Sequence, residues 1–285
     1  DAGHRLPAEA MTGGASGRLA FRPWRPLAFR RINWRGLWAL YYGYGIARFL
    51  RFGLETLVGP LVSSLLFLLV FVVGQRGLGE MLPGVGLKEF IAPGVVFYAV
   101  VYTAFQNSAA MIVMDKMEGT MADVQMAPLS PLEVMAGFAL SAASCGLMSG
   151  TLVLAGTAIF VDYSYFDVTV VLGFAVLAAL LFALAGSIAG LWAERWDHYG
   201  AVEGFLVVPL GLLSGTFFSV ERLPEAFRDW IYLNPVFYAV DGFRAGFIGQ
   251  AETSLALGAG LLAALNLALA LVAWRLFAAG YKIRP

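Results

Sequence analysis

The chain has 285 residues, of which 60% are hydrophobic and 13% are charged, about half the charged share of an ordinary soluble domain. With a mean hydropathy of +0.76, this composition excludes a typical soluble protein and indicates an integral membrane protein. The net charge is zero, so no basic field favours nucleic acid, and two histidines with a single cysteine form no metal-binding pattern.

The N-terminal part of the chain differs from the rest. We expect 1–21, which is rich in small and polar residues and lacks the apolar core of a signal peptide, to be a flexible tail. In 22–53, arginine is mixed with aromatic residues, and Trp34, Trp38 and Tyr41 fall at helical spacing. This pattern predicts a cytoplasmic amphipathic helix in the membrane interface, and a helix that faces water is the alternative.

Stretches without charge dominate the chain from residue 54 to residue 285. A helix needs about 20 apolar residues to cross a bilayer, and lipid offers backbone groups no other partner. We therefore expect an all-α integral membrane fold with six transmembrane helices. They lie near 57–74, 90–114, 134–161, 168–193, 204–220 and 253–274.

The basic residues indicate how the chain is threaded through the membrane. If both termini are cytoplasmic, 14 of the 19 Lys and Arg residues lie on the cytoplasmic side. Such an excess is typical of cytoplasmic segments. We therefore predict cytoplasmic N- and C-termini, with most of the excess in the N-terminal arm.

The segment 221–250 fits no simple span. It is largely apolar but carries Asp241 and Arg244, and it is interrupted at Asn234-Pro235, because the residue before proline avoids the α-helical region. We predict re-entrant or interfacial helices on the outer side before the last span. Asp241 and Arg244 are three residues apart, and we hypothesise that they pair and hold this hairpin in shape.

The second predicted span carries an aromatic stripe followed by amides. Tyr98, Tyr102 and Phe105 recur at helical spacing, and Gln106 and Asn107 come directly after them. Amides within a span favour protein or a cavity over lipid. They could line a path for an amphipathic substrate, or they could serve ordinary packing and hydrogen bonding between helices.

The loop after the second span reads DKMEGTMADVQMAPLSPLEVMAG. Met117, Met121, Val124 and Gln125 could form one face of a short helix. A short helix rich in methionine suits docking into a groove on a partner. The alternative is a surface connector that only reverses the chain.

Several kinds of chemistry are excluded or disfavoured. Lys88, Lys116 and Lys282 are the only lysines, and none precedes Ser or Thr, so the chain has no phosphate-binding loop. A membrane-embedded transferase would have to use Asp197 and His198, which we interpret as part of a solvated turn without a nucleophile motif. An ion-coupled carrier or channel would need charges at mid-span, and the six stretches carry none.

Two longer motifs resemble a known family, the membrane subunits of ATP-binding-cassette exporters of the second type. These include exporters of capsular and O-antigen polysaccharide, teichoic acid, nodulation lipo-oligosaccharide and some drugs. The first motif matches at Gly119, Thr120, Pro128, Leu129, Ser130 and Glu133. The second matches at Ser214, Gly215, Phe217, Phe218, Leu223, Pro224, Asn234, Pro235, Asp241 and Arg244.

The resemblance implies a permease subunit of the bacterial inner membrane that is not itself an enzyme. It implies a homodimer that works with two ATPase subunits, which bind ATP and Mg, so this chain needs no cofactor. The substrate would be amphipathic: a glycolipid, polysaccharide, lipid or drug. Coupling to the ATPase would involve Met117, Glu118, Gly119, Thr120, Met121, Asp123 and Gln125. The translocation path would involve Tyr98, Tyr102, Phe105, Gln106, Asn107, Phe217 and Phe218. The outer gate would involve Pro224, Asn234, Pro235, Asp241 and Arg244.

Overall fold

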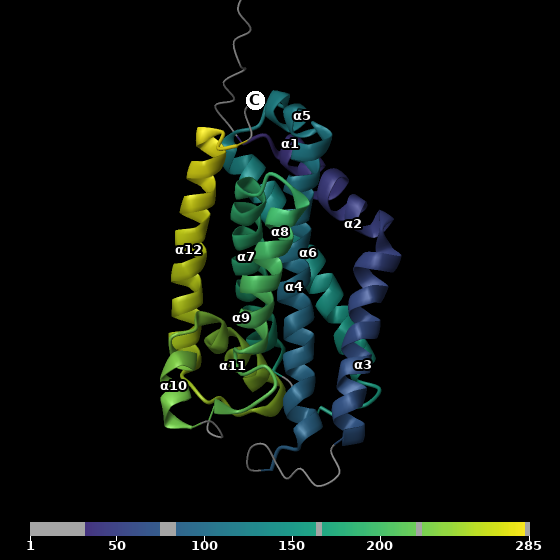
Figure 1. Ribbon diagram of the computed structural model, residues 1–285, viewed down its shortest axis with the longest axis vertical. Helices are drawn as coiled ribbons and strands as arrows, with labels where there is room; N and C mark the ends of the chain where they lie inside the picture. The colour runs from purple at the N-terminus through teal and green to yellow at the C-terminus, as the bar shows by residue number, and fades with distance from the viewer. Residues whose placement is uncertain (1–31, 75–83, 164–166, 221–223, 283–285) are drawn as a thin grey trace, which may run out of the picture.

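The computed structural model describes residues 32–74, 84–163, 167–220 and 224–282, and the elements that these ranges form are helices (Figure 1). The predicted tail 1–21 and the start of the predicted interfacial segment lie outside the described residues. In chain order the helices are α1 (Trp34–Trp38), the π-helix η1 (Ala39–Ile46), α2 (Ala47–Arg51), η2 (Leu54–Val58), α3 (Gly59–Gly74), α4 (Leu87–Glu118), α5 (Met121–Met126), α6 (Pro131–Thr157), α7 (Val168–Trp192), α8 (Trp196–Val202), η3 (Glu203–Val207), α9 (Val208–Leu212), α10 (Glu225–Tyr232), α11 (Pro235–Ile248) and α12 (Leu255–Ala279).

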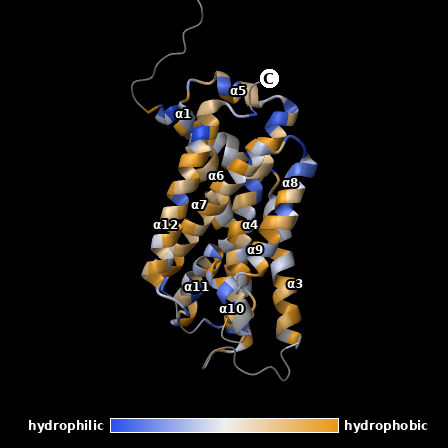
Figure 2. Ribbon diagram, turned by 60° about the vertical axis from the view of Figure 1, so that its left-hand side comes forward, coloured by the Kyte–Doolittle hydropathy of each residue, from blue (hydrophilic) through white to orange (hydrophobic). Residues whose placement is uncertain are grey.

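In the part of the chain that the structure describes, four helices are long and apolar enough to cross a bilayer, namely α4, α6, α7 and α12. A fifth candidate is a pair of helical segments, 34–51 and 55–71, which meet at an angle of 80°. Hydrophobic residues make up most of the length of the long helices, and many hydrophilic residues lie toward the two ends (Figure 2). The all-helical membrane class is therefore confirmed with four or five candidate spans, and a sixth span stays a prediction.

The predicted fifth span, 204–220, does not coincide with the helix that the structure has in this part of the chain. The helix begins earlier, at Trp196, continues through α8, η3 and α9, and ends at Leu212. It ends there because the chain turns at Gly215, whose φ is 72°, and because the Thr216 hydroxyl donates to the carbonyl of Gly211 at 2.6 Å. Glycine adopts positive φ without the clash that a Cβ would cause, and such local bonds compete with a continuing helix.

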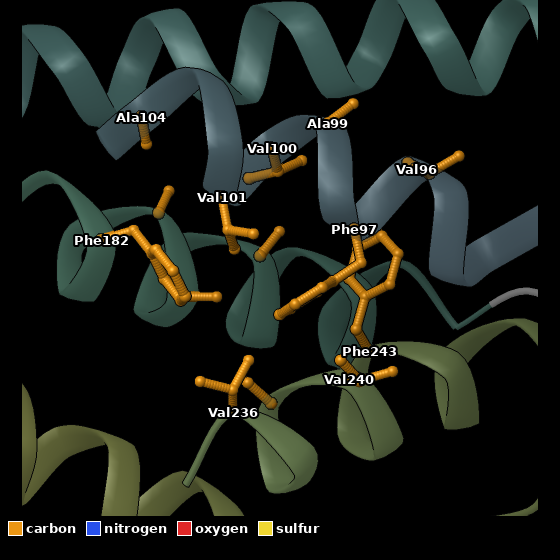
Figure 3. Packing of buried hydrophobic residues seen from close by; sticks show 14 of the residues in the cluster. Val96, Phe97, Ala99, Val100, Val101, Ala104, Phe182, Val236, Val240 and Phe243 are labelled. Atoms are coloured by element: carbon orange, nitrogen blue, oxygen red, sulfur yellow. The ribbon is translucent and has the colours of Figure 1, made fainter. Parts of the chain in front are cut away.

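The helix α4 is the centre of the bundle, with α6 and α7 packed along it. Figure 3 shows Phe97 and Val101 of α4 beside Phe182 of α7 and Phe243 of α11, and the rings of Phe97 and Phe243 are 5.7 Å apart. Because lipid is as apolar as these side chains, close packing and buried hydrogen bonds hold the helices together rather than the hydrophobic effect.

Glycines set the closest approaches of α4 to its neighbours. A Cβ added to Gly146 of α6 would lie 2.5 Å from the carbonyl oxygen of Val100, and one on Gly186 of α7 would lie 2.5 Å from that of Phe105. Hydroxyl pairs bridge the same contacts, for example Ser108 to Ser187 at 2.8 Å. Small residues in these two spans therefore mark the close contacts between helices, as is typical of membrane bundles.

We predict that Gly186→Ala lowers the thermal unfolding temperature of the purified protein, because the new methyl group meets backbone that cannot move aside. Overpacking of this kind costs about 1–3 kcal/mol. Gly173→Ala is the matched control, since Gly173 lies on the same helix with nothing within 4 Å of an added Cβ. Equal shifts for the two variants in a melt monitored by size-exclusion chromatography would contradict the assigned contact.

Candidate functional site

One end of the bundle carries the short helix α5, with α1 beside it (Figure 1). The helix α4 ends at Gly119, whose φ of 77° is left-handed and lets the chain turn into α5. Met117, Glu118, Asp123 and Gln125 are exposed there. These four of the predicted coupling residues therefore lie on the surface at this end of the molecule.

The faces of α5 differ from the helical face proposed from the sequence. Met121 and Val124 are buried and pack in a cluster with Phe277 near the end of α12. Met117 and Gln125 point outward instead. Met121 therefore anchors the helix to the bundle, and the exposed residues are the ones that a partner could contact.

A single carboxylate joins this surface to the N-terminal helix. Glu133 accepts hydrogen bonds from the backbone N–H groups of Asn33 at 2.5 Å and Ser130 at 2.6 Å. The Asn33 amide in turn donates to the carbonyl of Pro128 at 3.3 Å and accepts from the N–H of Gly36 at 3.1 Å. Glu133 thus closes the capping box of α6 and also holds the start of α1. The S-x-x-E pattern signals the cap, whereas nothing in the sequence points to Asn33.

A second set of polar contacts joins α2 to the end of α4 and to the start of α5. Arg48 of α2 forms an ion pair with Asp115 of α4 at 2.9 Å, and the Asp115 side chain is only 1% exposed. The hydroxyl of Thr120, at the start of α5, donates to the same carboxylate oxygen at 3.2 Å. A buried carboxylate needs such partners, and Asp115 consequently links α2, α4 and α5.

Two basic side chains bind polar groups at the C-terminal end of α7 and just beyond it. The Lys116 ammonium donates to the carbonyls of Gly190 at 3.1 Å and Leu191 at 2.8 Å, groups that a helix C-terminus leaves without partners. Beyond α7, Lys282 pairs with Glu194 at 2.8 Å and holds the pKa of that exposed carboxyl below its usual range.

A cavity of about 350 Å³ opens between α2, η2, α4 and α8. It is lined by Gln106 and Asn107, with Thr103 nearby, and by Arg48 and Glu55 from the N-terminal segment. The carbonyl oxygen of the Asn107 side chain has no hydrogen-bond partner among the described residues. Gln106 and Asn107 therefore line a cavity, and their role in a substrate path stays a prediction.

The aromatic residues predicted for the path lie in four different places. Tyr98 and Tyr102 stack with centroids 5.6 Å apart on the α9 side of α4. Phe105 is 2% exposed in the core. Phe217 packs against Phe67 of α3 at 4.7 Å, and Phe218 lines a separate groove between α9 and α10. The structure therefore does not bring these rings into one pocket.

The opposite end of the molecule contains α10 and α11. Pro224 is exposed and precedes α10. Asn234 caps α11 by accepting from the N–H of Val236 at 3.0 Å and donates to the Ser214 hydroxyl at 3.0 Å, while Pro235 is the first residue of the helix. The break predicted at Asn234-Pro235 is confirmed, and the asparagine also ties α11 to the turn after α9.

The predicted pairing of Asp241 with Arg244 is wrong in detail. Both are buried, but no ion pair joins them within the described residues. Asp241 accepts from the N–H groups of Glu252 at 2.9 Å and Thr253 at 2.8 Å. Arg244 reaches to the turn after α9, where it donates to the carbonyl of Gly215 at 2.5 Å. The two side chains leave α11 in different directions, and each satisfies a different loop.

Arg244 also meets an aromatic ring. Its guanidinium carbon lies 3.7 Å from the ring centroid of Phe90 near the start of α4, a cation–π arrangement that partly offsets the loss of water. The arginine accordingly connects three elements, α4, α11 and the turn after α9. Among the fully buried side chains of the described residues, that of Arg244 is the largest.

Comparisons with known proteins place these features in context. A family model described as "ABC-2 type transporter" matches residues 37–248. The "Inner membrane transport permease YadH" of Escherichia coli (strain K12) is 32% identical over 241 residues, which cover 84% of this chain and 93% of that protein. "Nodulation protein J" of Rhizobium leguminosarum bv. viciae is 24% identical over 236 residues, covering 81% of this chain and 88% of that protein. "Nodulation protein J" of Rhizobium meliloti (strain 1021) is 23% identical over 234 residues, covering 81% and 87% respectively.

Proposed function

Since the chain belongs to the ABC-2 type transporter family, we propose that it is the membrane-spanning subunit of an ATP-driven exporter that acts as a homodimer with two copies of a separate ATPase. The name of the Escherichia coli relative describes a transport permease, and this supports a permease subunit rather than an enzyme. We place it in the bacterial inner membrane with both termini cytoplasmic.

The observation that carries this proposal is the platform formed by α1 and α5 at one end of the bundle. Glu133 and Asp115 tie both short helices to the long helices α6 and α4. A movement imposed on this platform would therefore be transmitted along helices that reach the opposite end. An ATPase subunit could bind the mixed apolar and acidic surface formed by the exposed Met117, Glu118 and Asp123.

The substrate would pass along the side of α4 that carries Gln106 and Asn107. Their cavity has hydrogen-bonding groups beside apolar walls, and this mixture suits an amphipathic molecule with a polar headgroup. A glycolipid, a lipid-linked polysaccharide, a lipid or a drug would satisfy the same chemistry. In this proposal, nucleotide binding closes the ATPase dimer and moves α4 relative to the α8–α9 helix.

We predict that Glu118→Arg and Asp123→Arg lower ATP hydrolysis by the purified complex about tenfold or release the ATPase subunit, because reversed charges repel a partner built for acidic ones. Asp229→Arg, an equally exposed change on α10 at the opposite end, is the control and should leave both unchanged. The measurement is hydrolysis together with identification of the chains that co-purify with a tagged copy.

Two results would point elsewhere. A chain that purifies alone and transports without nucleotide would favour a carrier or channel. Loss of activity on substituting Asp197 and His198 by alanine would favour a transferase. Both residues lie in the short turn and helix after α7, and Asp197 is exposed, so we expect these substitutions to leave transport unchanged.

A further inference from the structure

A second hollow, about 580 Å³ in volume, lies on the other side of α4 from the amide-lined cavity. It is a groove between α7 and α12 on one wall and the α8–η3–α9 helix on the other. Its lining is almost wholly hydrocarbon and includes Leu181, Ala185 and Ile188 of α7, Leu206 and Leu210 of the facing helix, and Leu269 of α12. A polar headgroup or sugar would find hardly any hydrogen-bonding partner inside it.

The length of the groove matches one leaflet of a bilayer. Its lining on α7 runs from Leu181 to Trp192, eleven residues along a helix that rises 1.5 Å per residue, or about 16 Å. Half of the hydrocarbon core of a membrane is about 15 Å thick. An acyl chain that enters from one surface would therefore fill the groove and end near the bilayer midplane.

One end of the groove has the residues that hold a lipid headgroup at the membrane surface. Trp192 and Tyr281 line this end, and the Lys282 ammonium lies 5.7 Å and 5.8 Å from their ring centroids. Aromatic rings and basic side chains are typical of the membrane interface. The other end is lined by Pro235 and Val236, and the lining of the groove includes no charged residue there. The two ends of the groove therefore differ, and a lipid would bind with its headgroup at the end near Lys282.

The charge at that end favours an anion. Lys282 pairs with Glu194 at 2.8 Å, and the Lys116 ammonium is held at the same end of α7 by the carbonyls of Gly190 and Leu191. Arg275 is exposed one residue before Leu276, which lines the groove. Three basic side chains and the carboxylate of Glu194 therefore lie at this end among the described residues, and the basic side chains attract an anionic headgroup.

We propose that this groove is a binding site for one acyl chain of an anionic phospholipid, with the phosphate at Lys282 on the α5 side of the membrane. The inference requires only that the chain lies in a bilayer, and it goes beyond ATP-driven export. A bound chain would fill the space behind the α8–α9 helix and brace that helix against α7 and α12.

The test is lipid binding by the full chain, purified from membranes with the subunits that accompany it. Native mass spectrometry should show one retained phosphatidylglycerol per copy after delipidation and titration. Ala185→Phe should weaken this binding about tenfold, since a ring in the groove displaces about two methylene groups. Ala268→Phe, on the exposed side of α12, should not change it.

The headgroup is tested separately. Lys282→Gln should reduce the preference for phosphatidylglycerol over phosphatidylcholine about fivefold, the effect of one basic residue near an anionic lipid. Unchanged preference in this variant, or unchanged binding in Ala185→Phe, would overturn the assignment.

A measurement without a core substitution guards against misfolding of Ala185→Phe. Phosphatidylglycerol brominated on its acyl chain should quench tryptophan fluorescence less in Trp192→Phe than in Trp196→Phe, because only Trp192 lines the groove. Equal quenching in the two variants would overturn the proposal. So would a disulfide between two copies carrying Cys145→Ala and Ala185→Cys, which would assign the groove to a second chain.

Discussion

Glutamine in place of Glu133 should detach α1 from the α5–α6 junction while leaving the transmembrane helices assembled. The carboxylate uses both oxygens, one for the N–H of Asn33 and one for that of Ser130. An amide has a single acceptor oxygen, so one of the two N–H groups would face the NH₂ group of the new side chain. A buried donor left without an acceptor costs about 1–3 kcal/mol, and Glu133 is only 7% exposed.

Hydrogen exchange measured by mass spectrometry gives a direct readout of this change. Amides of α1 and of α5 should exchange about tenfold faster in Glu133→Gln, since about 1.4 kcal/mol of lost stability corresponds to that factor. Amides of α11, at the opposite end, should be unaffected. Glu118→Gln is the control, because Glu118 is exposed in the same region. If α1 exchanged no faster in Glu133→Gln than in the control, the carboxylate would not be what holds this helix.

The same variant also tests the proposed coupling. If α1 and α5 act as one platform, the Glu133→Gln complex should keep ATP hydrolysis but transmit it poorly to the membrane helices. Protection of the α8–α9 helix should then no longer change on adding nucleotide. A nucleotide response equal to that of the unmodified complex would show that α5 alone transmits the movement.

Removal of the Arg244 side chain should have the largest effect on stability. Arg244→Met leaves the carbonyls of Gly215 and Thr216 without their donor and leaves the carboxylates of Asp241 and Glu252 without a nearby cation. Breaking a buried charge arrangement in this way costs about 3–5 kcal/mol. We expect a marked loss of thermal stability and release of the turn after α9, whereas Arg195→Ala, at an exposed position, should behave as the unmodified protein.

Exchange of the two charges tests the corrected geometry. Because Asp241 and Arg244 bind different loops, Asp241→Arg combined with Arg244→Asp should be no more stable than either single variant. The arginine would then face the N–H groups of Glu252 and Thr253, and the aspartate would face carbonyl oxygens. Rescue by the double variant in a thermal melt would restore the direct pair that the sequence spacing predicted.

The amino-acid sequence alone predicts that this protein lies in lipid and where most of its long helices are. Charge-free stretches located α4, α6, α7 and α12 correctly, because lipid permits only structures whose backbone groups are satisfied internally. A short signal also identified a local feature. Asn234-Pro235 separates α10 from α11. The proline restricts the backbone of the residue before it, so no distant contact is needed to predict this break.

The direction in which each side chain points, and the distant groups that it contacts, depend on the tertiary structure. Hydropathy hardly distinguishes the core side of a membrane helix from its lipid side, since both are apolar. The sequence therefore gave no sign that Phe105 lies in the core while Gln106 lines a cavity, or that Met121 anchors α5. The bond between Glu133 and Asn33 spans 100 residues, and the separate partners of Asp241 and Arg244 depend on how α11 is rotated. Such contacts follow from the packing of whole helices, which no local pattern in the chain encodes.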